Sequence, residues 1–488
     1  MSVEPKGRGN LDAILATAEH DRARLDSKAL GAFSLTLLGV ASVVGAGIFV
    51  VTGDAAAHYA GPAVLISFVL AGIVAGLTAL CYAELASSIP AAGSTYSYAF
   101  AAFGPLIGWF IGWDLLLEYL FAASTVAVGW SGYFVSLTET LGVQIPHALA
   151  SPPFGDDPGV VNLPAIAVML LTSGALWLGT KESAVANNAM VILKLAILSL
   201  VVGVGIFYVT STNLTPFVPA HEGGFGDFGW SGVLRGAGIV FFAYIGFDAV
   251  STAAAESRDP RRTVPIGLLG TVLIATAIYI AVGFVLTGML DYRQLGVADP
   301  IAAALEAGGR DLDWLLKLTD VAAVVGLAST VLVTLYGQTR IFMRMSEDGM
   351  LPPAFGRVSR RTRTPQFSIV LCGIVGSLVA GFVPLSVLGE LISIGTLLAF
   401  IIVSAGVVTL RRRYPDLERP FRVPALPLVA GTAIVASIAL MVTLPGATWI
   451  RLAIWAALGF TVYFFYARKH SAERMRGLAE AAPERAGA

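Results

Sequence analysis

Long apolar stretches separated by short polar segments make up most of the chain from residue 31 onward. A helix needs about 20 mostly apolar residues to cross the hydrocarbon core of a membrane. Twelve stretches satisfy this requirement and predict twelve transmembrane helices: 31–52, 61–87, 105–138, 160–180, 184–209, 232–255, 264–290, 318–346, 366–384, 386–409, 424–445 and 448–467. The third and eighth stretches are long enough to require a strong tilt or a projecting end.

An aromatic segment lies between the second and third predicted spans. Residues 94–103 contain Tyr96, Tyr98, Phe100 and Phe103. Because aromatic rings favour the boundary between headgroups and hydrocarbon, this composition predicts a segment that lies in the membrane interface.

The distribution of positive charge predicts the orientation of the chain. If the N-terminus is cytoplasmic, 25 of the 31 lysine and arginine residues fall in cytoplasmic segments and 5 fall outside, while Lys194 lies within a span. Cytoplasmic loops of membrane proteins carry an excess of lysine and arginine. We therefore expect an inner-membrane protein with both termini in the cytoplasm.

The composition supports a membrane protein and excludes several functions. Of the 488 residues, 56% are hydrophobic and only 13% are charged, about half the charged fraction of soluble domains. A net charge of −1 implies no general attraction to nucleic acid. Cys81 and Cys372 lie in apolar runs and indicate neither a disulfide framework nor a metal site. The N-terminal residues lack the apolar core of a signal peptide.

Two of the predicted spans contain glycines near their centres. The first reads GAGIF at 45–49, and the sixth reads FAYIGFD at 242–248. Paired glycine-interrupted spans at matching positions of two halves indicate a transporter site built from an inverted repeat. The alternative is close packing of intact helices through small residues, and the correspondence of the two positions favours broken helices.

The motifs at these positions resemble those of the amino acid–polyamine–organocation superfamily. They are the two glycine-containing segments, YAEL at 82–85 with the glycine-containing segment 90–96, and YGQTRIFMRMSEDGMLP at 336–352. The last motif is similar to bacterial members of the cationic amino acid transporter branch. The resemblance covers residues 28–465 and implies an all-α, leucine-transporter-type fold, with five plus five inverted spans and two further helices.

This resemblance implies a division of the chain and a function. The expected parts are a cytoplasmic tail (1–30), a transport core (31–409) with repeats 31–209 and 232–409, two additional helices (410–467) and a second tail (468–488). The expected function is proton-coupled uptake of an L-amino acid by alternating access, and the alternative within this fold is exchange of amino acids. No enzymatic activity and no cofactor is expected.

The resemblance also implies a binding site made largely of main-chain groups. Backbone N–H groups of the first break face the substrate carboxylate at the positive end of a half-helix, and carbonyl groups of the second break accept from the α-ammonium group. Thr334 is expected to line the side-chain pocket, and Phe242 resembles the aromatic gate of the family. The expected substrate-binding residues are Val44, Gly45, Ala46, Gly47, Ile48, Phe242, Ala243, Ile245 and Thr334.

Lys194 lies in the middle of the fifth predicted span. A charged residue at the bilayer centre costs at least about 2.5–3.5 kcal/mol and needs a partner or a proton-handling role. The resemblance implies that this lysine stands where sodium-coupled relatives bind their second sodium ion, bridging the first span near Val43 or Gly45 to a hydroxyl of the eighth span, Ser329 or Thr330. The alternative is a permanently charged structural contact.

Further charged residues are candidates for proton handling or for a cytoplasmic gate. Glu118 and Asp114 lie one turn apart on the third span, and Glu118 matches a glutamate of similar carriers. They form either a second proton site or hydrogen-bonded structural contacts. A second group lies near predicted cytoplasmic ends and forms either a gate network or solvated charges: Glu84, Asp248, Glu256, Arg261 and Arg262.

Two other classes of membrane protein are weaker alternatives. A channel is disfavoured because the chain lacks a Thr-Val-Gly-Tyr-Gly filter and ring-forming acidic motifs. A haem or metal enzyme is disfavoured because all five histidines fall outside the predicted spans. The expected partners are the substrate, protons and lipid. The sequence leaves open which amino acid is carried.

Overall fold

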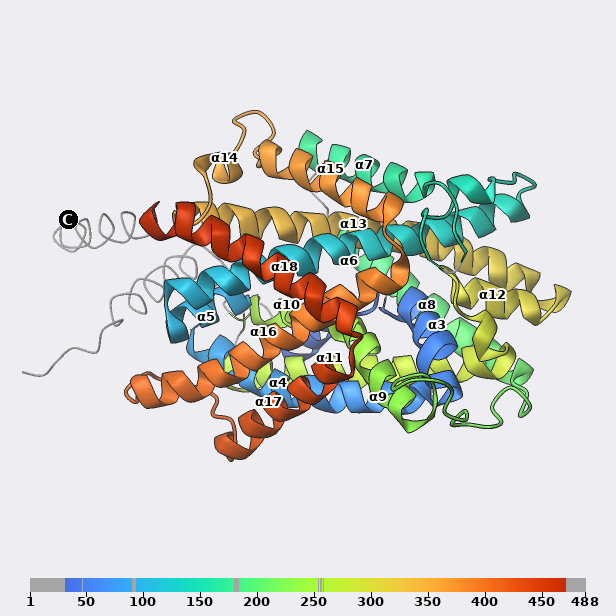
Figure 1. Cartoon of the computed structure of the whole chain (residues 1–488), viewed down its shortest axis with the longest axis horizontal. Helices are drawn as coiled ribbons and strands as arrows, with labels where there is room; N and C mark the ends of the chain where they lie inside the picture. The colour runs from blue at the N-terminus through green and yellow to red at the C-terminus, as the bar shows by residue number, and fades with distance from the viewer. Residues whose placement is uncertain are drawn as a thin grey trace, which may run out of the picture.

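The computed structural model describes residues 31–45, 47–89, 94–155, 157–179, 184–252, 254, 257 and 259–470. Within these residues the chain consists of helices joined by loops. The long helices run side by side along the longest axis of the molecule (Figure 1). Two predicted spans are each divided into several short elements. The first span consists of α2 (Ala32–Val43), followed by η1 (Gly47–Val51), α3 (Thr52–Ala55) and η2 (Ala56–Ala60). The sixth span consists of α9 (Gly229–Val240), η6 (Phe241–Tyr244) and α10 (Ala249–Thr252).

Each of the other predicted spans corresponds to one main helix. These helices are α4 (Val64–Ser88), α6 (Pro105–Thr140), α7 (Leu163–Leu178), α8 (Ala184–Gly205), α11 (Pro260–Met289), α13 (Asp313–Glu347), α15 (Gln366–Phe382), α16 (Leu385–Arg413), α17 (Leu426–Thr443) and α18 (Gly446–Val462). Nine stretches of the described residues are long and apolar enough to cross a membrane, and α2, α7 and α15 are shorter apolar helices. The first of the nine, Gly47–Ser88, joins the second half of the first span to the second span. The prediction of an all-α multi-span membrane protein is confirmed.

The two longest helices form the centre of the bundle. α6 has 36 residues and α13 has 35, which correspond to lengths of about 54 Å and 52 Å. Both exceed the hydrocarbon thickness of about 30 Å, so their ends project or the helices tilt. They pack along each other, and α16 and α7 pack against the same helix α6.

The aromatic segment between the second and third spans is buried inside the protein. It forms helix α5 (Ser94–Phe103), which packs against α6 and α16. Tyr96, Tyr98 and Phe100 are each less than 7% exposed, and the Tyr96 hydroxyl donates to Asp348 Oδ2 at 2.8 Å. The rings therefore fill the bundle, and the expectation that they face the headgroup boundary was wrong.

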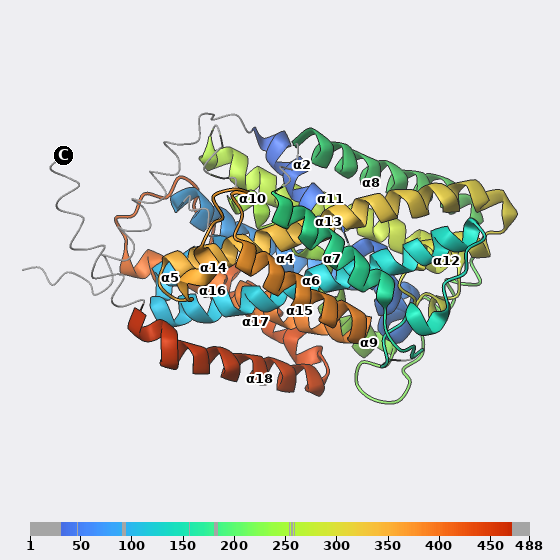
Figure 2. The ribbon, with the colours of Figure 1, turned by 90° about the horizontal axis from the view of Figure 1, so that it is seen from above.

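The last helix is attached to the long helix α6 by paired indole groups. Figure 2 shows α18 along one edge of the molecule. Trp113 Nε1 donates to the carbonyl of Trp455 at 2.9 Å, and Trp455 Nε1 donates back to the carbonyl of Trp113 at 3.1 Å. The two rings are stacked with centroids 4.7 Å apart. These contacts fix α18 to the long central helices of the bundle.

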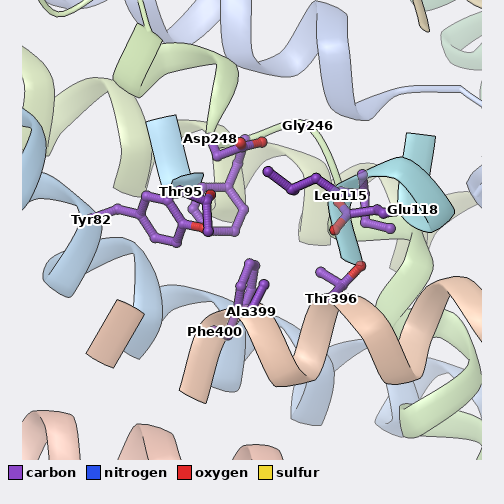
Figure 3. Close-up of a pocket in the computed structure, with 11 residues that line it drawn as sticks. Tyr82, Thr95, Leu115, Glu118, Gly246, Asp248, Thr396, Ala399 and Phe400 are labelled. Carbon is purple, nitrogen blue, oxygen red and sulfur yellow. The ribbon is translucent and has the colours of Figure 1, made fainter. Parts of the chain in front are cut away.

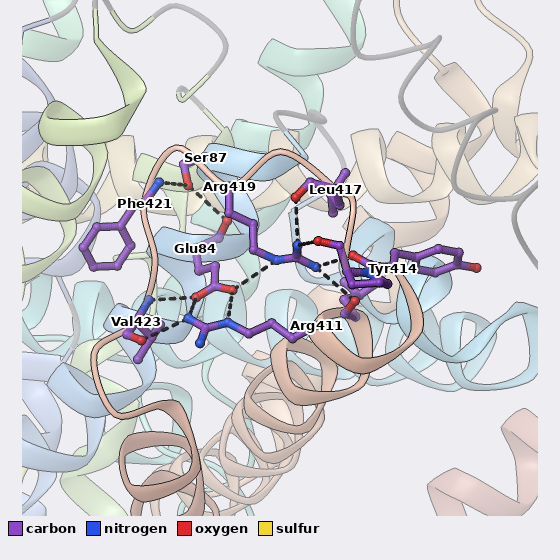
Figure 4. A network of polar contacts seen from close by, with 10 residues as sticks. Glu84, Ser87, Arg411, Tyr414, Leu417, Arg419, Phe421 and Val423 are labelled. Atoms are coloured by element: carbon purple, nitrogen blue, oxygen red, sulfur yellow. Dashed lines mark hydrogen bonds and ion pairs between the residues drawn. The ribbon is translucent and has the colours of Figure 1, made fainter.

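Glu84, near the end of α4, connects that helix to α16 and to the loop that follows α16. The Glu84 side chain is 2% exposed and accepts from Arg411 at 2.7 Å and 2.5 Å and from the Val423 N–H at 2.7 Å. Arg419 lies 3.5 Å from the same carboxylate and donates to four main-chain carbonyls of residues 410–417 (Figure 4). A bidentate pair with further donors satisfies a buried carboxylate, and we infer that α4 and α16 are held together at this end.

This network differs from the charged group expected from the sequence. Arg261 and Arg262 are exposed at the beginning of α11, and Glu256 lies outside the described residues. The partners of Glu84 are arginines more than 320 positions away in the sequence.

We expect Glu84→Ala to destabilise the protein by about 3–5 kcal/mol, because the change removes the carboxylate that accepts from both the Arg411 guanidinium and the Val423 N–H. The unfolding midpoint of purified protein, measured by thermal denaturation in detergent, should fall clearly. Arg412→Ala, which removes an exposed arginine beside Arg411, is the matched control and should leave the midpoint unchanged. Equal midpoints for Glu84→Ala and wild type would show that the network does not contribute to stability.

Candidate functional site

Both glycine-containing spans are interrupted where the glycines predict. α2 ends at Val43, and Val44 adopts an extended conformation before the helix resumes at Gly47. In the sixth span, α9 ends at Val240 and a tight turn over η6 leads to an extended Ile245. Gly246 then has φ +100°, which lies in the region that favours glycine. The broken-helix prediction is therefore confirmed at both positions, and Ala46 lies outside the described residues.

The two breaks pack directly against each other. A Cβ atom on Gly47 would lie 2.4 Å from both Cα and Cβ of Ala243. A Cβ atom on Gly246 would lie 2.9 Å from the carbonyl oxygen of Ser42. The absence of side chains at these glycines is thus what allows the opened backbones to approach each other.

Tyr279 of α11 connects the two breaks. Its hydroxyl group, which is fully buried, lies 3.0 Å from the Val43 carbonyl oxygen and 2.6 Å from the Ala243 carbonyl oxygen and can donate to either. These are carbonyl groups that helix breakage leaves without their usual partners. Tyr279 is not predictable as a site residue, since one tyrosine within an apolar span carries no local signal.

Lys194 joins the first break to the eighth span. The Lys194 side chain is 4% exposed, and its Nζ donates to the Val44 carbonyl at 3.0 Å and to Thr330 Oγ1 at 3.3 Å. The stem of the lysine passes beside Gly326 of α13, where a Cβ atom would lie 2.7 Å from Lys194 Cγ. An ammonium group therefore lies between the opened backbone of the first span and a hydroxyl of α13.

The structure places the remaining α13 candidates near this contact. Thr330, and not its neighbour Ser329, supplies the hydroxyl that meets Lys194. The Thr334 hydroxyl donates to the Thr330 carbonyl at 2.8 Å, one turn further along the helix. Thr330 and Thr334 are both partly exposed, so neither residue is fully buried in the core.

The carbonyl groups expected to bind an ammonium group already have protein partners. The Phe242 carbonyl accepts from the Ile245 N–H at 3.1 Å, and the Ala243 carbonyl accepts from Tyr279. A carbonyl oxygen has two lone pairs, so each can accept a second hydrogen bond. The Phe242 side chain is 5% exposed and lies at the turn between α9 and the break.

A small pocket lies beside the second break and contains Glu118. Figure 3 shows Glu118 and Thr396 on one side of this hollow and Tyr82 and Thr95 on the other. The full lining consists of Tyr82, Thr95, Leu115, Glu118, Ile245, Gly246, Phe247, Asp248, Thr396, Ala399 and Phe400. The pocket thus brings two carboxyl groups and several hydroxyls to the opened backbone of residues 245–248.

Two broken helices that face each other within a bundle of apolar spans define a membrane carrier with a site inside the bundle. The chain matches the amino acid permease family over residues 30–465 and belongs to that family, within the amino acid–polyamine–organocation superfamily. It is therefore a transporter and not an enzyme.

Several characterised transporters are similar over most of the chain. The methylthioribose transporter of Bacillus subtilis (strain 168) is 44% identical over 445 residues, covering 91% of this chain and 94% of that protein. The branched-chain amino acid permease BcaP of the same organism is 41% identical over 464 residues, covering 94% and 97%. The vacuolar cationic amino acid transporter 2 of Arabidopsis thaliana is 36% identical over 398 residues, covering 81% and 61%.

We expect Gly47→Ala to reduce amino acid uptake by at least about tenfold, because the added methyl group meets the backbone of Ala243 and forces the two breaks apart. Uptake of radiolabelled amino acids, corrected for the amount of protein in the membrane, provides the measurement. Gly76→Ala is the matched control, since a Cβ atom there meets nothing within 4 Å. Normal uptake by Gly47→Ala would mean that contact between the breaks is not needed for transport.

Proposed function

We propose that this protein is a secondary active transporter that takes up L-amino acids together with protons, by alternating access around the two breaks. The N–H groups at residues 45–47 bind the substrate carboxylate, because those of Val44 and Ile48 already donate to the carbonyls of Val40 and Gly45. The carbonyl groups of Phe242, Ala243 and Ile245 bind the α-ammonium group. These contacts recognise the part that all α-amino acids share. The branched-chain amino acid permease and the cationic amino acid transporter are named for amino acids with different side chains, which agrees with a common main-chain site and a variable side-chain pocket near Thr334. Methylthioribose, the substrate named for the other relative, is a sugar without a carboxylate or an ammonium group, so that name does not support the main-chain site.

The position of Lys194 carries the proposal that protons, and not sodium ions, drive uptake. The ammonium group is held 3.0 Å from the Val44 carbonyl and 3.3 Å from the Thr330 hydroxyl, oxygen ligands of the kind that a sodium ion would use. Two positive charges a few ångströms apart repel strongly in a medium of low dielectric constant. A protonated lysine at this point therefore excludes sodium from the same oxygens.

Loss of the lysine proton supplies a mechanism for opening. The charged group ties the first break to α13, and a neutral amine binds the Val44 carbonyl less strongly. Proton release at Lys194 would thus free the α2 half of the first span to swing away from α13, while Glu118 beside the second break provides a further proton acceptor. The long helices α6 and α13 act as the fixed part in this cycle.

The same proposal includes the placement of the chain in the cell. The excess of arginine and lysine on the side of the N-terminus supports a location in the inner membrane with both termini in the cytoplasm. Residues 31–409 would form the transport core, in repeats 31–209 and 232–409. Residues 410–467 would add two helices, and residues 1–30 and 468–488 would form cytoplasmic tails.

We expect Lys194→Ala to abolish pH-driven accumulation in proteoliposomes, so that the ratio of internal to external amino acid falls to one. Wild type should accumulate substrate with an inward proton gradient and should not respond to a sodium gradient. Lys317→Ala, which removes an exposed lysine of α13, is the control and should accumulate substrate normally. Sodium-driven uptake by wild type, or full proton-driven accumulation by Lys194→Ala, would contradict the coupling mechanism.

A further inference from the structure

Asp114 is a buried acid of α6 that takes no part in the transport mechanism described above. The residue is 2% exposed, and neither carboxyl oxygen has a hydrogen-bond partner within the described ranges of the chain. The carboxyl group points at Gly395 of α16, where a Cβ atom would lie 2.9 Å from Asp114 Oδ1. The space left by this glycine therefore accommodates the carboxyl group between two packed helices.

The nearest ionisable neighbour on the same helix face is Glu118. Residues four apart on a helix have Cβ atoms about 5–6 Å apart, and Glu118 is itself only 5% exposed. Thr396, the residue after Gly395, lines the same pocket as Glu118. Asp114 and Glu118 thus occupy adjacent turns of α6 against adjacent residues of α16.

No positive charge in the described part of the chain is placed to compensate this pair. The elements α5, α7, α15, η1 and η10 (Tyr463–Ala467) that pack against α6 contain no charged or histidine residue. Asp248 is a third acid, beside the second break. The charged residues of α13, α16 and α18 pair elsewhere or lie towards the helix ends: Asp313, Lys317, Asp320, Arg340, Arg344, Glu347, Glu390, Arg411, Arg412, Arg413 and Arg451.

When two carboxylates lie one turn apart, away from water and without a neighbouring cation, their repulsion makes the free energy of ionising both of them high. We propose that Asp114 and Glu118 form an electrostatically coupled acid pair that holds one proton on one of its two carboxyl groups, with Asp114 as the positioning residue whose charge keeps this proton on Glu118. Such a pair binds and releases protons as a unit. This proposal rests on the proton-coupled function above, since it assigns part of the proton-binding capacity of the carrier.

The test compares the pH dependence of uptake in wild type and Asp114→Asn. Replacing the acid by its neutral isostere removes the like charge beside Glu118, which then binds its proton about tenfold less tightly. The pH of half-maximal uptake should therefore move about one unit to the acid side. Asp114→Glu, which restores the acid, should keep the wild-type profile, as should Asp311→Asn at an exposed position.

A second measurement detects the proton of the acid pair without transport. Infrared spectra of the purified protein distinguish protonated from ionised carboxyl groups. Wild type should show a protonated carboxyl band whose loss with rising pH occurs about one pH unit lower in Asp114→Asn. An unchanged pH profile and an unchanged band would overturn the acid pair. A normal band in a wild type that ignores the proton gradient would instead contradict the proton-coupled function and leave the pair standing.

Discussion

The backbone groups freed at the two breaks must find hydrogen-bond partners, because the hydrocarbon core supplies none. Side chains of other helices provide these partners. Tyr279 reaches the carbonyls of Val43 and Ala243, and Lys194 reaches the carbonyl of Val44. In η1, which follows the first break, the Phe49 carbonyl accepts from the Tyr133 hydroxyl of α6 at 2.8 Å. The opened chain is therefore held by contacts from α6, α8 and α11.

This constraint divides the molecule into parts that can move and parts that support them. The breaks are held by single donors, such as one hydroxyl or one ammonium group, so few bonds have to be given up when a break changes its conformation. By contrast, Glu84 and its arginines form several charge-assisted bonds between α4 and α16, and paired indoles fix α18 to α6. A carrier that alternates between two states needs both kinds of contact.

Local sequence signals were sufficient to predict the helices and the breaks. Apolar length determines a span, and central glycines weaken it, so both features are readable from neighbouring residues. The resemblance to a known family predicted that Lys194 meets a hydroxyl of the eighth span but left Ser329 and Thr330 as equal candidates, and the helix rotation seen in the structure was needed to identify Thr330. Tyr279 and the arginine partners of Glu84 could not be predicted, since their roles depend on which distant segments the fold brings together.

The aromatic helix α5 illustrates a different limit of the sequence. Its tyrosines and phenylalanines suit an interface and a packed interior equally well, since a ring with a polar hydroxyl satisfies both environments. Only the presence of an acceptor decides between them, and Asp348, about 250 positions away, accepts from Tyr96. Ring composition therefore identified residues 94–103 as a distinct segment but predicted the wrong surroundings for its rings.

The central claim is that substrate binds between the two breaks through main-chain groups. A structure of the protein with its transported amino acid, determined by electron cryomicroscopy, tests this most directly. We predict that the carboxylate contacts N–H groups of residues 45–47 and that the ammonium group contacts carbonyls of Phe242, Ala243 or Ile245. An amino acid bound elsewhere in the bundle, with both breaks still closed on each other as Gly47 and Ala243 are here, would contradict the claim.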